Sequence, residues 1–330
     1  MPSRAQALIR KIDMKSVVEA NGLRRTFGDL VAVDGIDLSV SEGEVFGFLG
    51  PNGAGKSTAV RMLTTLLRPT DGQAFVGGYN VVSQASEVRK VIGVALQDAA
   101  IDPLMTGREL LKLQAVLHGI PRQSARDRGE ELLERVGLSA AADRRVGTYS
   151  GGMRRRLDLA LSLIHEPKIL FLDEPTTGLD PTSRTALWEE VRRLNTEFGT
   201  TVFLTTQYLE EADELAGRIA IIDYGKIVRE GSPADLKASI GAPTLRIDID
   251  PQNLDKAQSV LSEFGIDRPA RDGRVAIGLD GGVAKVAEVV SALERQGVEV
   301  LHLELDAPSL DDVFAEATGR RLEGAETPDE

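Results

Sequence analysis

Gly50-Pro51-Asn52-Gly53-Ala54-Gly55-Lys56-Ser57 matches the pattern G-x-x-x-x-G-K-[ST] at every fixed position. It lies between residues 44–49, whose largely apolar content predicts a buried strand, and residues 58–67, whose composition is helical. A strand, a glycine-rich loop and a helix in this order surround an anion with backbone N–H groups and the positive end of the helix. The sequence therefore predicts a phosphate-binding loop.

Two side chains of this loop carry the expected chemistry. Lys56 would neutralise the β- and γ-phosphates of a nucleoside triphosphate, and Ser57 would bind a magnesium ion. The alternative is a glycine-rich turn that only caps a helix. The predicted strand before the loop and the predicted helix after it favour phosphate binding.

The composition indicates a folded protein of two domains. The chain has 330 residues, of which 42% are hydrophobic and 27% charged, and this balance fits neither a disordered nor a fibrous protein. The absence of cysteine excludes disulfides, a thiol nucleophile and cysteine-bound metal sites. No apolar run approaches the roughly 20 residues of a membrane span, and the N-terminus lacks the apolar block of a secretory signal. We therefore expect a cytoplasmic location.

The negative charge is concentrated at one end of the chain. Residues 241–330 carry 9 basic and 19 acidic side chains, which is −10 of the net −12. This balance disfavours a nucleic-acid partner and suggests that a separate module begins near residue 240. We expect a flexible leader at 1–15, a first domain at 16–240, an accessory domain at 241–318 and a disordered acidic tail at 319–330.

Periodicity predicts the elements of both domains. Residues 98–150 have helical periodicity and are assigned to an inserted helical subdomain, with Leu110, Leu113, Val116 and Leu117 on one face of a helix. Apolar strands at 168–172 and 201–204 flank a helix at 184–197, which predicts a parallel sheet. The accessory domain alternates strands with helices and is expected to be a small α+β domain resembling a ferredoxin-like fold. Its predicted elements are strands 244–249, 274–277 and 298–305 and helices 253–264, 283–296 and 310–317.

Two acids follow the apolar strand at residues 168–172. A carboxylate at the end of a buried strand is costly unless it meets a cation or hydrogen-bond donors, so Asp173 is a candidate magnesium partner reached through water. Glu174 would then face the γ-phosphate and polarise the attacking water. The alternative is two solvent-exposed acids at a strand end.

A second helix start in the same chain can bind an anion. Ser150 is followed by Gly151 and Gly152, and this arrangement leaves backbone N–H groups free. Taken alone, the serine would be only a helix N-cap. The next three residues, Arg154, Arg155 and Arg156, are interpreted as a solvated helical face, with contact to phosphate or a membrane surface as the alternative.

Taken together, GPNGAGKST, Gln97, YSGGM, ILFLDEPTTGLD and TTQYLEEAD resemble, in this order, the nucleotide-binding subunit of ATP-binding cassette (ABC) transporters. The resemblance covers about residues 16–235. It implies an α/β P-loop NTPase fold of the ABC type, with a mostly parallel core sheet, an antiparallel β-subdomain and an inserted helical subdomain. It also implies a head-to-tail homodimer that holds two ATP molecules between the phosphate loop of one copy and Ser150-Gly151-Gly152 of the other.

The resemblance assigns further roles, position by position. Phe27 would stack on adenine, with a core phenylalanine as the alternative, and Asp180 would bridge the two copies. Gln97 would contact magnesium and the attacking water, with a polar strand end as the alternative. The resemblance assigns the binding of Mg²⁺ to Ser57, Gln97 and Asp173, and it assigns catalysis to Lys56, Glu174 and Gln207. The complete set of residues expected to contact the nucleotide is Phe27, Gly50, Pro51, Asn52, Gly53, Ala54, Gly55, Lys56, Ser57, Thr58, Gln97, Ser150, Gly151, Gly152 and Asp180.

The chain departs from the usual family pattern in two motifs. Tyr149 and Met153 replace leucine and glutamine at the ends of the Leu-Ser-Gly-Gly-Gln signature, while the phosphate-facing serine and glycines remain. Gln207 stands at the place of the switch histidine. A glutamine amide donates a hydrogen bond but cannot become a cation, so slow hydrolysis is expected. The three histidines, His118, His165 and His302, occur in other contexts and are interpreted as structural.

YSGGMRRRLD, TTQYLEEAD and the C-terminal PSLDDVFAEATG make the chain similar to ATP-binding subunits of the daunorubicin/doxorubicin-resistance drug exporters of actinobacteria. That resemblance implies a separate transmembrane permease and a position at the cytoplasmic face of the membrane. Export of a lipid or polysaccharide is the alternative cargo, and a soluble ABC ATPase acting on ribosomes or DNA is the alternative class. The single cassette and the absence of a heptad insertion disfavour the soluble class.

Overall fold

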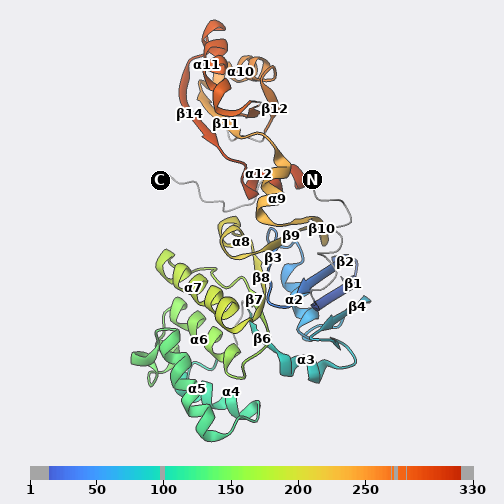
Figure 1. The fold of residues 1–330 in the computed structure, drawn as a ribbon, viewed down its shortest axis with the longest axis vertical. Coiled ribbons are helices and arrows are strands. Elements are labelled where there is room, and N and C mark those ends of the chain that lie inside the picture. The colour runs from blue at the N-terminus through green and yellow to red at the C-terminus, as the bar shows by residue number, and fades with distance from the viewer. Residues whose placement is uncertain (1–14, 97–100, 269, 271–273, 280, 321–330) are drawn as a thin grey trace, which may run out of the picture. The chain divides into compact units, whose positions relative to one another are not determined.

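The computed structural model describes residues 15–96, 101–268, 270, 274–279 and 281–320. By their internal contacts, the residues divide into two compact units, 1–227 and 228–330, ahead of the boundary expected at residue 240. The expected leader, apart from Lys15, and residues 321–330 of the expected tail lie outside the described residues. Figure 1 shows the elements of each unit.

The first unit contains an antiparallel sheet with the strand order β2-β1-β4-β5. Along β1, Val18, Ala20 and Leu23 are buried while their neighbours are more exposed, because alternate side chains of a strand point to opposite faces. The bounds of these strands are β1 (Ser16–Phe27), β2 (Leu30–Ser41), β4 (Asp71–Val76) and β5 (Tyr79–Asn80).

The second sheet has six strands in the order β10-β9-β3-β8-β7-β6, and β10 spans residue 227, at which the first unit ends. The predicted parallel pairing is confirmed for β9, β3, β8, β7 and β6. Phe203 packs at its centre, with ring centroids 5.3–5.6 Å from those of Phe46, Phe48 and Phe171. The strands are β3 (Val45–Leu49), β6 (Ile92–Ala95), β7 (Ile169–Asp173), β8 (Thr201–Thr206), β9 (Arg218–Asp223) and β10 (Lys226–Gly231).

Parallel pairing brings the carboxyl ends of neighbouring strands to one edge of the sheet. Leu49 of β3 pairs with Thr206 of β8, and Asp173 of β7 pairs with Thr205 of β8. The phosphate loop leaves β3 at this edge, and the candidate acids leave β7 beside it. Ligands of open parallel sheets bind at such an edge.

Helices cover this sheet and build the helical region. The first unit contains α2 (Lys56–Leu63), α3 (Ala85–Val91), α4 (Gly107–Leu117), α5 (Arg122–Arg135), α6 (Gly151–Leu163), α7 (Pro181–Phe198) and α8 (Leu209–Leu215), with short 3₁₀ turns at Ser139–Ala141 and Val146–Thr148. Helix α2 ends earlier than the predicted residue 67. The hydroxyl of Thr64 donates to the Val60 carbonyl, and Thr65 has a left-handed φ of 69° that ends the helix.

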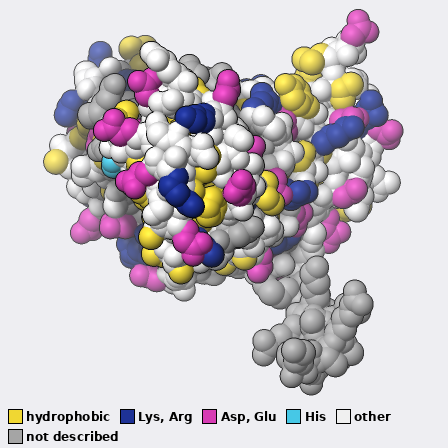
Figure 2. Space-filling view, turned by 90° about the horizontal axis from the view of Figure 1, so that it is seen from above, with side chains coloured by type: hydrophobic (Ala, Val, Ile, Leu, Met, Phe, Trp, Pro, Cys, Tyr) yellow, Lys and Arg dark blue, Asp and Glu magenta, His cyan; other side chains and the backbone are white. Residues whose placement is uncertain are grey.

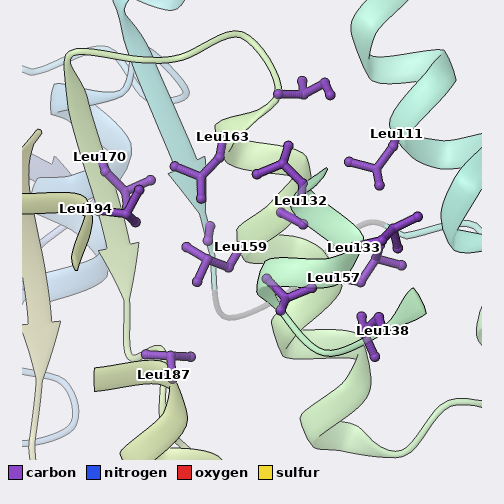
Figure 3. Packing of buried hydrophobic residues seen from close by; sticks show 14 of the residues in the cluster. Leu111, Leu132, Leu133, Leu138, Leu157, Leu159, Leu163, Leu170, Leu187 and Leu194 are labelled. Atoms are coloured by element: carbon purple, nitrogen blue, oxygen red, sulfur yellow. The ribbon is translucent and has the colours of Figure 1, made fainter. Parts of the chain in front are cut away.

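Leucine side chains hold the helical region to the sheet. Figure 3 shows Leu157, Leu159 and Leu163 of α6 lying between leucines of α5 and Leu170 of β7. One predicted face was wrong: on α4, Leu110 and Leu111 are buried, whereas Leu113, Val116 and Leu117 are 45–71% exposed. Helical spacing groups Leu113, Val116 and Leu117 on one face, but the neighbouring helices cover a different face.

The second unit has the order of elements and strands of a ferredoxin-like fold. Its sheet runs β12-β13-β11-β14 with antiparallel pairing, and α10 and α11 follow β11 and β13. The prediction missed β12, which has three residues. The elements are α9 (Pro233–Ile240), β11 (Thr244–Ile249), α10 (Leu254–Leu261), β12 (Gly265–Asp267), β13 (Arg274–Leu279), α11 (Val286–Arg295), β14 (Val300–Asp306) and α12 (Leu310–Thr318), with 3₁₀ turns at Pro251–Asn253 and Gly282–Lys285.

The apolar character of the helices and the charge of the surface both bear on function. Within the part of the chain that the structure describes, no helix has the length and apolar character needed to cross a bilayer. On the face drawn in Figure 2, basic side chains are interspersed with acidic ones.

Candidate active site

The phosphate loop needs glycine at two positions where the backbone closely approaches its neighbours. A Cβ atom on Gly55 would lie 2.3 Å from the Ala32 carbonyl oxygen, and φ of Gly55 is 108°. A Cβ atom on Gly50 would lie 2.4 Å from the Ile222 carbonyl oxygen. The N–H of Gly50 also donates to the carbonyl of Thr206 at 3.2 Å, which fixes the start of the loop to β8.

The loop opens directly into α2, whose N-cap is Gly55. No side chain caps this helix, so its first N–H groups remain available to an anion. The Lys56 ammonium points back into the loop and donates to the carbonyls of Gly50 at 2.6 Å and Pro51 at 3.1 Å. These features satisfy the structural context that a phosphate-binding loop requires.

Lys56 also forms a buried ion pair with Glu174. Its Nζ lies 3.1 Å from Glu174 Oε1, and the two side chains are 4% and 6% exposed. Burial lowers the pKa of Lys56 below its ordinary value, and the Glu174 carboxylate opposes that shift. The predicted cation and the predicted base are therefore in direct contact, and the alternative of two solvent-exposed acids is wrong.

Asp173 accepts hydrogen bonds from two hydroxyl groups. Its Oδ1 lies 2.5 Å from Thr205 Oγ1 and 3.2 Å from Ser57 Oγ, and its residue is 1% exposed. This juxtaposition of a carboxylate and a hydroxyl fits Mg²⁺, which takes few protein oxygens and completes its shell with substrate phosphates and water. The described residues contain no cluster of three or more histidine or acidic side chains that would form a cage made of protein ligands alone.

Glu174 has a left-handed backbone conformation, with φ of 47°, which is rare outside glycine. Thr205 holds it there, because the Glu174 N–H donates to the Thr205 carbonyl at 3.1 Å and to its hydroxyl at 3.0 Å. Thr205 was not among the site residues predicted from the sequence. The signal was present, since two threonines interrupt the apolar run of β8 at its carboxyl end.

The second predicted anion site lies at the start of α6. Ser150 caps this helix by accepting a hydrogen bond from the N–H of Met153 at 3.2 Å, and both Ser150 and Gly151 are exposed. Among the described residues, no hydrogen bond joins Ser150, Gly151 or Gly152 to the phosphate loop. An exposed helix start separate from the loop is the arrangement that a site shared between two copies requires.

Tyr149, which departs from the family pattern, is a core residue. It is 4% exposed, its hydroxyl donates to the Ala141 carbonyl at 2.7 Å, and burial raises its pKa. The ring fills the place of an apolar side chain, and the buried hydroxyl has a partner.

The predicted solvated arginine face is wrong for two of its three residues. Arg154 is exposed, but Arg156 donates to the Val136 carbonyl at 2.8 Å. Arg155 is 11% exposed in its side chain and donates to the carbonyls of Asp173 and Pro175. These arginines satisfy backbone carbonyls at the ends of neighbouring elements, which helical spacing alone does not reveal.

Phe27 and Asp180 lie on the surface. Phe27 ends β1 and is 45% exposed, with the Arg25 guanidinium 4.5 Å from its ring centroid, so it is not a core phenylalanine. Asp180 caps α7, accepting from the N–H of Ser183 at 2.9 Å and from its hydroxyl at 2.6 Å. These hydrogen bonds lower the pKa of Asp180.

Of the remaining predicted residues, Gln207 lies at this edge of the sheet. Gln207 follows β8 directly and is partly exposed, while Gln97 lies outside the described residues. The rings of His118 and His165 stack with centroids 3.9 Å apart, and burial lowers the pKa of both. His302 lies in β14.

Comparison with known proteins identifies the family. Residues 33–177 match the model of the ABC transporter family, and residues 231–318 match that of the C-terminal domain of DrrA1-3-like ATP-binding proteins. The chain is 47% identical to the daunorubicin resistance ATP-binding protein DrrA2 of Streptomyces coeruleorubidus, over 94% of this chain and 97% of that protein. The chain belongs to the ABC transporter ATP-binding proteins.

A second relative and a solved structure of this ABC protein's family support the same assignment. The protein is 46% identical to the daunorubicin/doxorubicin resistance ATP-binding protein DrrA of Streptomyces peucetius, over 94% of each chain. Among solved structures, it resembles the dimeric ATP-binding cassette MJ0796 bound to ADP and Pi, with a TM-score of 0.61, 26% identity, and coverage of 65% of this chain and 98% of that one. The protein is thus an ATPase with the ABC fold.

Proposed function

We propose that this protein is the ATP-driven motor subunit of an exporter that moves a drug or lipophilic metabolite through a separate membrane permease. The observation that carries the ATP chemistry is the contact of Lys56 with Glu174 beside that of Ser57 with Asp173. The proposed cargo rests on relatives named for daunorubicin resistance, which match almost the whole chain.

Each residue at the sheet edge has a role in this proposal. Backbone N–H groups at the start of α2 hold the phosphates, and Lys56 neutralises the charge of the β- and γ-phosphates. Glu174, whose Oε1 now accepts from Lys56, accepts a proton from the attacking water. Phe27 stacks on the adenine with its exposed ring.

Magnesium belongs to the same proposal. Ser57, Asp173 and Gln97 would hold Mg²⁺, which when bound neutralises phosphate charge. Asp173 is fixed for this role by the Thr205 hydroxyl, which holds one carboxylate oxygen and orients the other.

The site is completed by a second copy of the chain. Ser150, Gly151 and Gly152 of that copy would donate to the γ-phosphate, and Asp180 would lie at the contact between the copies. Gln207 would donate a neutral hydrogen bond to the same phosphate. Closure of the two copies on ATP drives the permease, and hydrolysis reopens them.

The proposal places the protein at the cytoplasmic face of the membrane, where the permease would hold it. The ferredoxin-like unit lies outside the residues assigned to ATP chemistry, and we propose that residues 241–318 form an accessory domain. Its surplus of acidic residues would discourage direct binding to anionic lipid.

Reconstitution tests this function. The protein is purified together with its permease, and the complex is reconstituted into liposomes with the ATP-binding protein on the outside. ATP hydrolysis and the uptake of daunorubicin into these vesicles are then measured in the same preparation. We expect daunorubicin to stimulate hydrolysis and ATP to drive uptake, with Glu174→Gln abolishing both. Stimulation by lipid or polysaccharide alone would reassign the cargo. ATP hydrolysis that neither responds to the permease nor drives any uptake would contradict the exporter function.

A further inference from the structure

Arg155 lies on α6, called here the signature helix because it begins at the Ser150-Gly151-Gly152 signature, and its side chain reaches two strand ends. Its guanidinium donates to three backbone carbonyls on two strand ends: Nη2 to Asp173 at 2.7 Å, Nε to Pro175 at 2.9 Å, and Nη1 to Leu96. The side chain is 11% exposed. Three charge-assisted hydrogen bonds from one buried group fix these carbonyls relative to α6.

The three carbonyls bracket residues of the proposed hydrolytic site. Asp173 and Pro175 are the immediate neighbours of Glu174, and Leu96 immediately precedes Gln97. Glu174 itself has the left-handed φ of 47°. A non-glycine residue persists in that conformation only when its surroundings hold it, and Arg155 holds the carbonyls of the two residues that flank Glu174.

A buried acid completes this arrangement. Asp158 lies one helical turn after Arg155, its Oδ2 is 3.4 Å from Arg155 Nη1, and its side chain is 12% exposed. The acid holds the guanidinium from the helix side, while the three carbonyls hold it from the sheet side. The ammonium group of lysine lacks the planar array of N–H donors of a guanidinium, so a lysine at this position cannot make all of these hydrogen bonds at once.

We propose that Arg155 is a positioning residue for ATP hydrolysis, which fixes the direction of Glu174 and ties the signature helix to the ends of β7 and β6. This inference rests on the proposed role of Glu174 as the base. The same helix begins at Ser150, which is proposed to bind the ATP held by the other copy. Arg155 therefore links the position of each copy's signature to the geometry of its own base.

The decisive experiment uses the full chain with Arg155→Gln and Asp158→Ala combined, so that no buried acid is left unpaired. We expect kcat per bound nucleotide to fall about 10- to 100-fold, because a small misplacement of the base is enough for such a loss. The Kd for Mg²⁺-ATP should change less than about twofold. A merely structural role would lower the folded fraction, and hence the number of binding sites, without changing kcat per site.

Two further variants complete the test. Arg155→Lys should keep the charge beside Asp158 and still lose about tenfold in kcat, and it carries the test if the double variant does not fold. Arg193→Gln, in an exposed pair with Glu197 on α7, removes the same charge and should leave kcat unchanged. If the double variant folds and has a normal kcat, the positioning role of Arg155 is overturned, while Glu174 can still be the base. If the double variant does not fold, a normal kcat in Arg155→Lys has the same meaning. Normal kcat in Glu174→Gln overturns the proposed base and this inference together.

Discussion

The ammonium of Lys56 and the carboxylate of Glu174 lie 3.1 Å apart, both almost fully buried, and they join the phosphate loop to the end of β7. Lys56 is therefore held by the residue proposed as the base. A bound triphosphate would compete with Glu174 for this ammonium, because both are anions that need the same cation. The binding of phosphate by Lys56 would then release Glu174 from its ion pair.

Glu174→Gln should retain ATP binding and lose turnover. The glutamine fills the same volume and still accepts a hydrogen bond from Lys56, but it cannot accept a proton. We expect kcat to fall by at least about 100-fold, the usual contribution of a general base, with the Kd for ATP within a few-fold. The check is steady-state hydrolysis beside equilibrium binding of a fluorescent ATP analogue.

Glu197→Gln is the matched control, since Glu197 is exposed and pairs with Arg193 on the surface of α7. Its turnover should equal that of the unaltered protein. If Glu174→Gln hydrolyses ATP as fast as this control, Glu174 is not the base.

Gln207→His should raise the hydrolysis rate. Histidine can carry a positive charge toward the γ-phosphate, whereas the glutamine amide cannot. We expect kcat to rise by up to about tenfold, equivalent to about 1.4 kcal/mol in the barrier, with ATP affinity little changed. A large fall in kcat would show that the glutamine has a function of its own.

The nucleotide site was predictable to the extent that it is local in the sequence. Eight consecutive residues specify the phosphate loop, and an apolar strand running into Asp173 and Glu174 specifies the opposing carboxylates. The parallel order of β3, β8 and β7 then brings them together, since their carboxyl ends meet at one edge.

Contacts that depend on the packing of distant elements were not predictable. The helical spacing of α6 does not show which of its arginines is buried. In the structure Arg155 reaches the Asp173 carbonyl of β7, whereas Arg154 is exposed. Likewise, apolar residues on α4 form two adjacent faces, and the sequence does not show that only the face with Leu110 and Leu111 is covered. Strand β12 has too few residues for alternation to be recognised.

The stability of the first unit should depend on pH through Asp158. Burial raises the pKa of Asp158 to about 7, with Arg155 opposing the shift, while the unfolded chain titrates near 4. Between these values the folded state binds more protons than the unfolded state, so the contribution of Asp158 to stability falls as pH rises.

The comparison with Asp158→Asn isolates this effect. Relative to that variant, the unaltered protein should lose about 1–3 kcal/mol of unfolding free energy between pH 5 and pH 8. Urea unfolding followed by the fluorescence of Trp188, the single tryptophan, reports on this unit. A difference that stays constant with pH would show that Asp158 does not titrate in this range.

Tyr149→Phe should destabilise the helical region without changing the chemistry. Removal of the hydroxyl deletes one hydrogen bond to the Ala141 carbonyl, which still accepts from the Arg144 N–H at 2.9 Å, so the cost should be about 0.5–1.5 kcal/mol. ATP affinity should stay the same, because Ser150 and the glycines after it are untouched. Loss of ATP-dependent dimerisation in a fully folded variant would instead place Tyr149 in the binding surface.

The central claim is that one active site is built from the phosphate loop of one copy and the signature of another, and complementation tests it most directly. Lys56→Ala and Ser150→Arg are each expected to be inactive, because every site in either homodimer lacks one half. Mixed dimers contain one site with both halves intact, so an equimolar mixture that exchanges subunits should recover about a quarter of the unaltered hydrolysis rate. A mixture no more active than its two components would contradict the shared site.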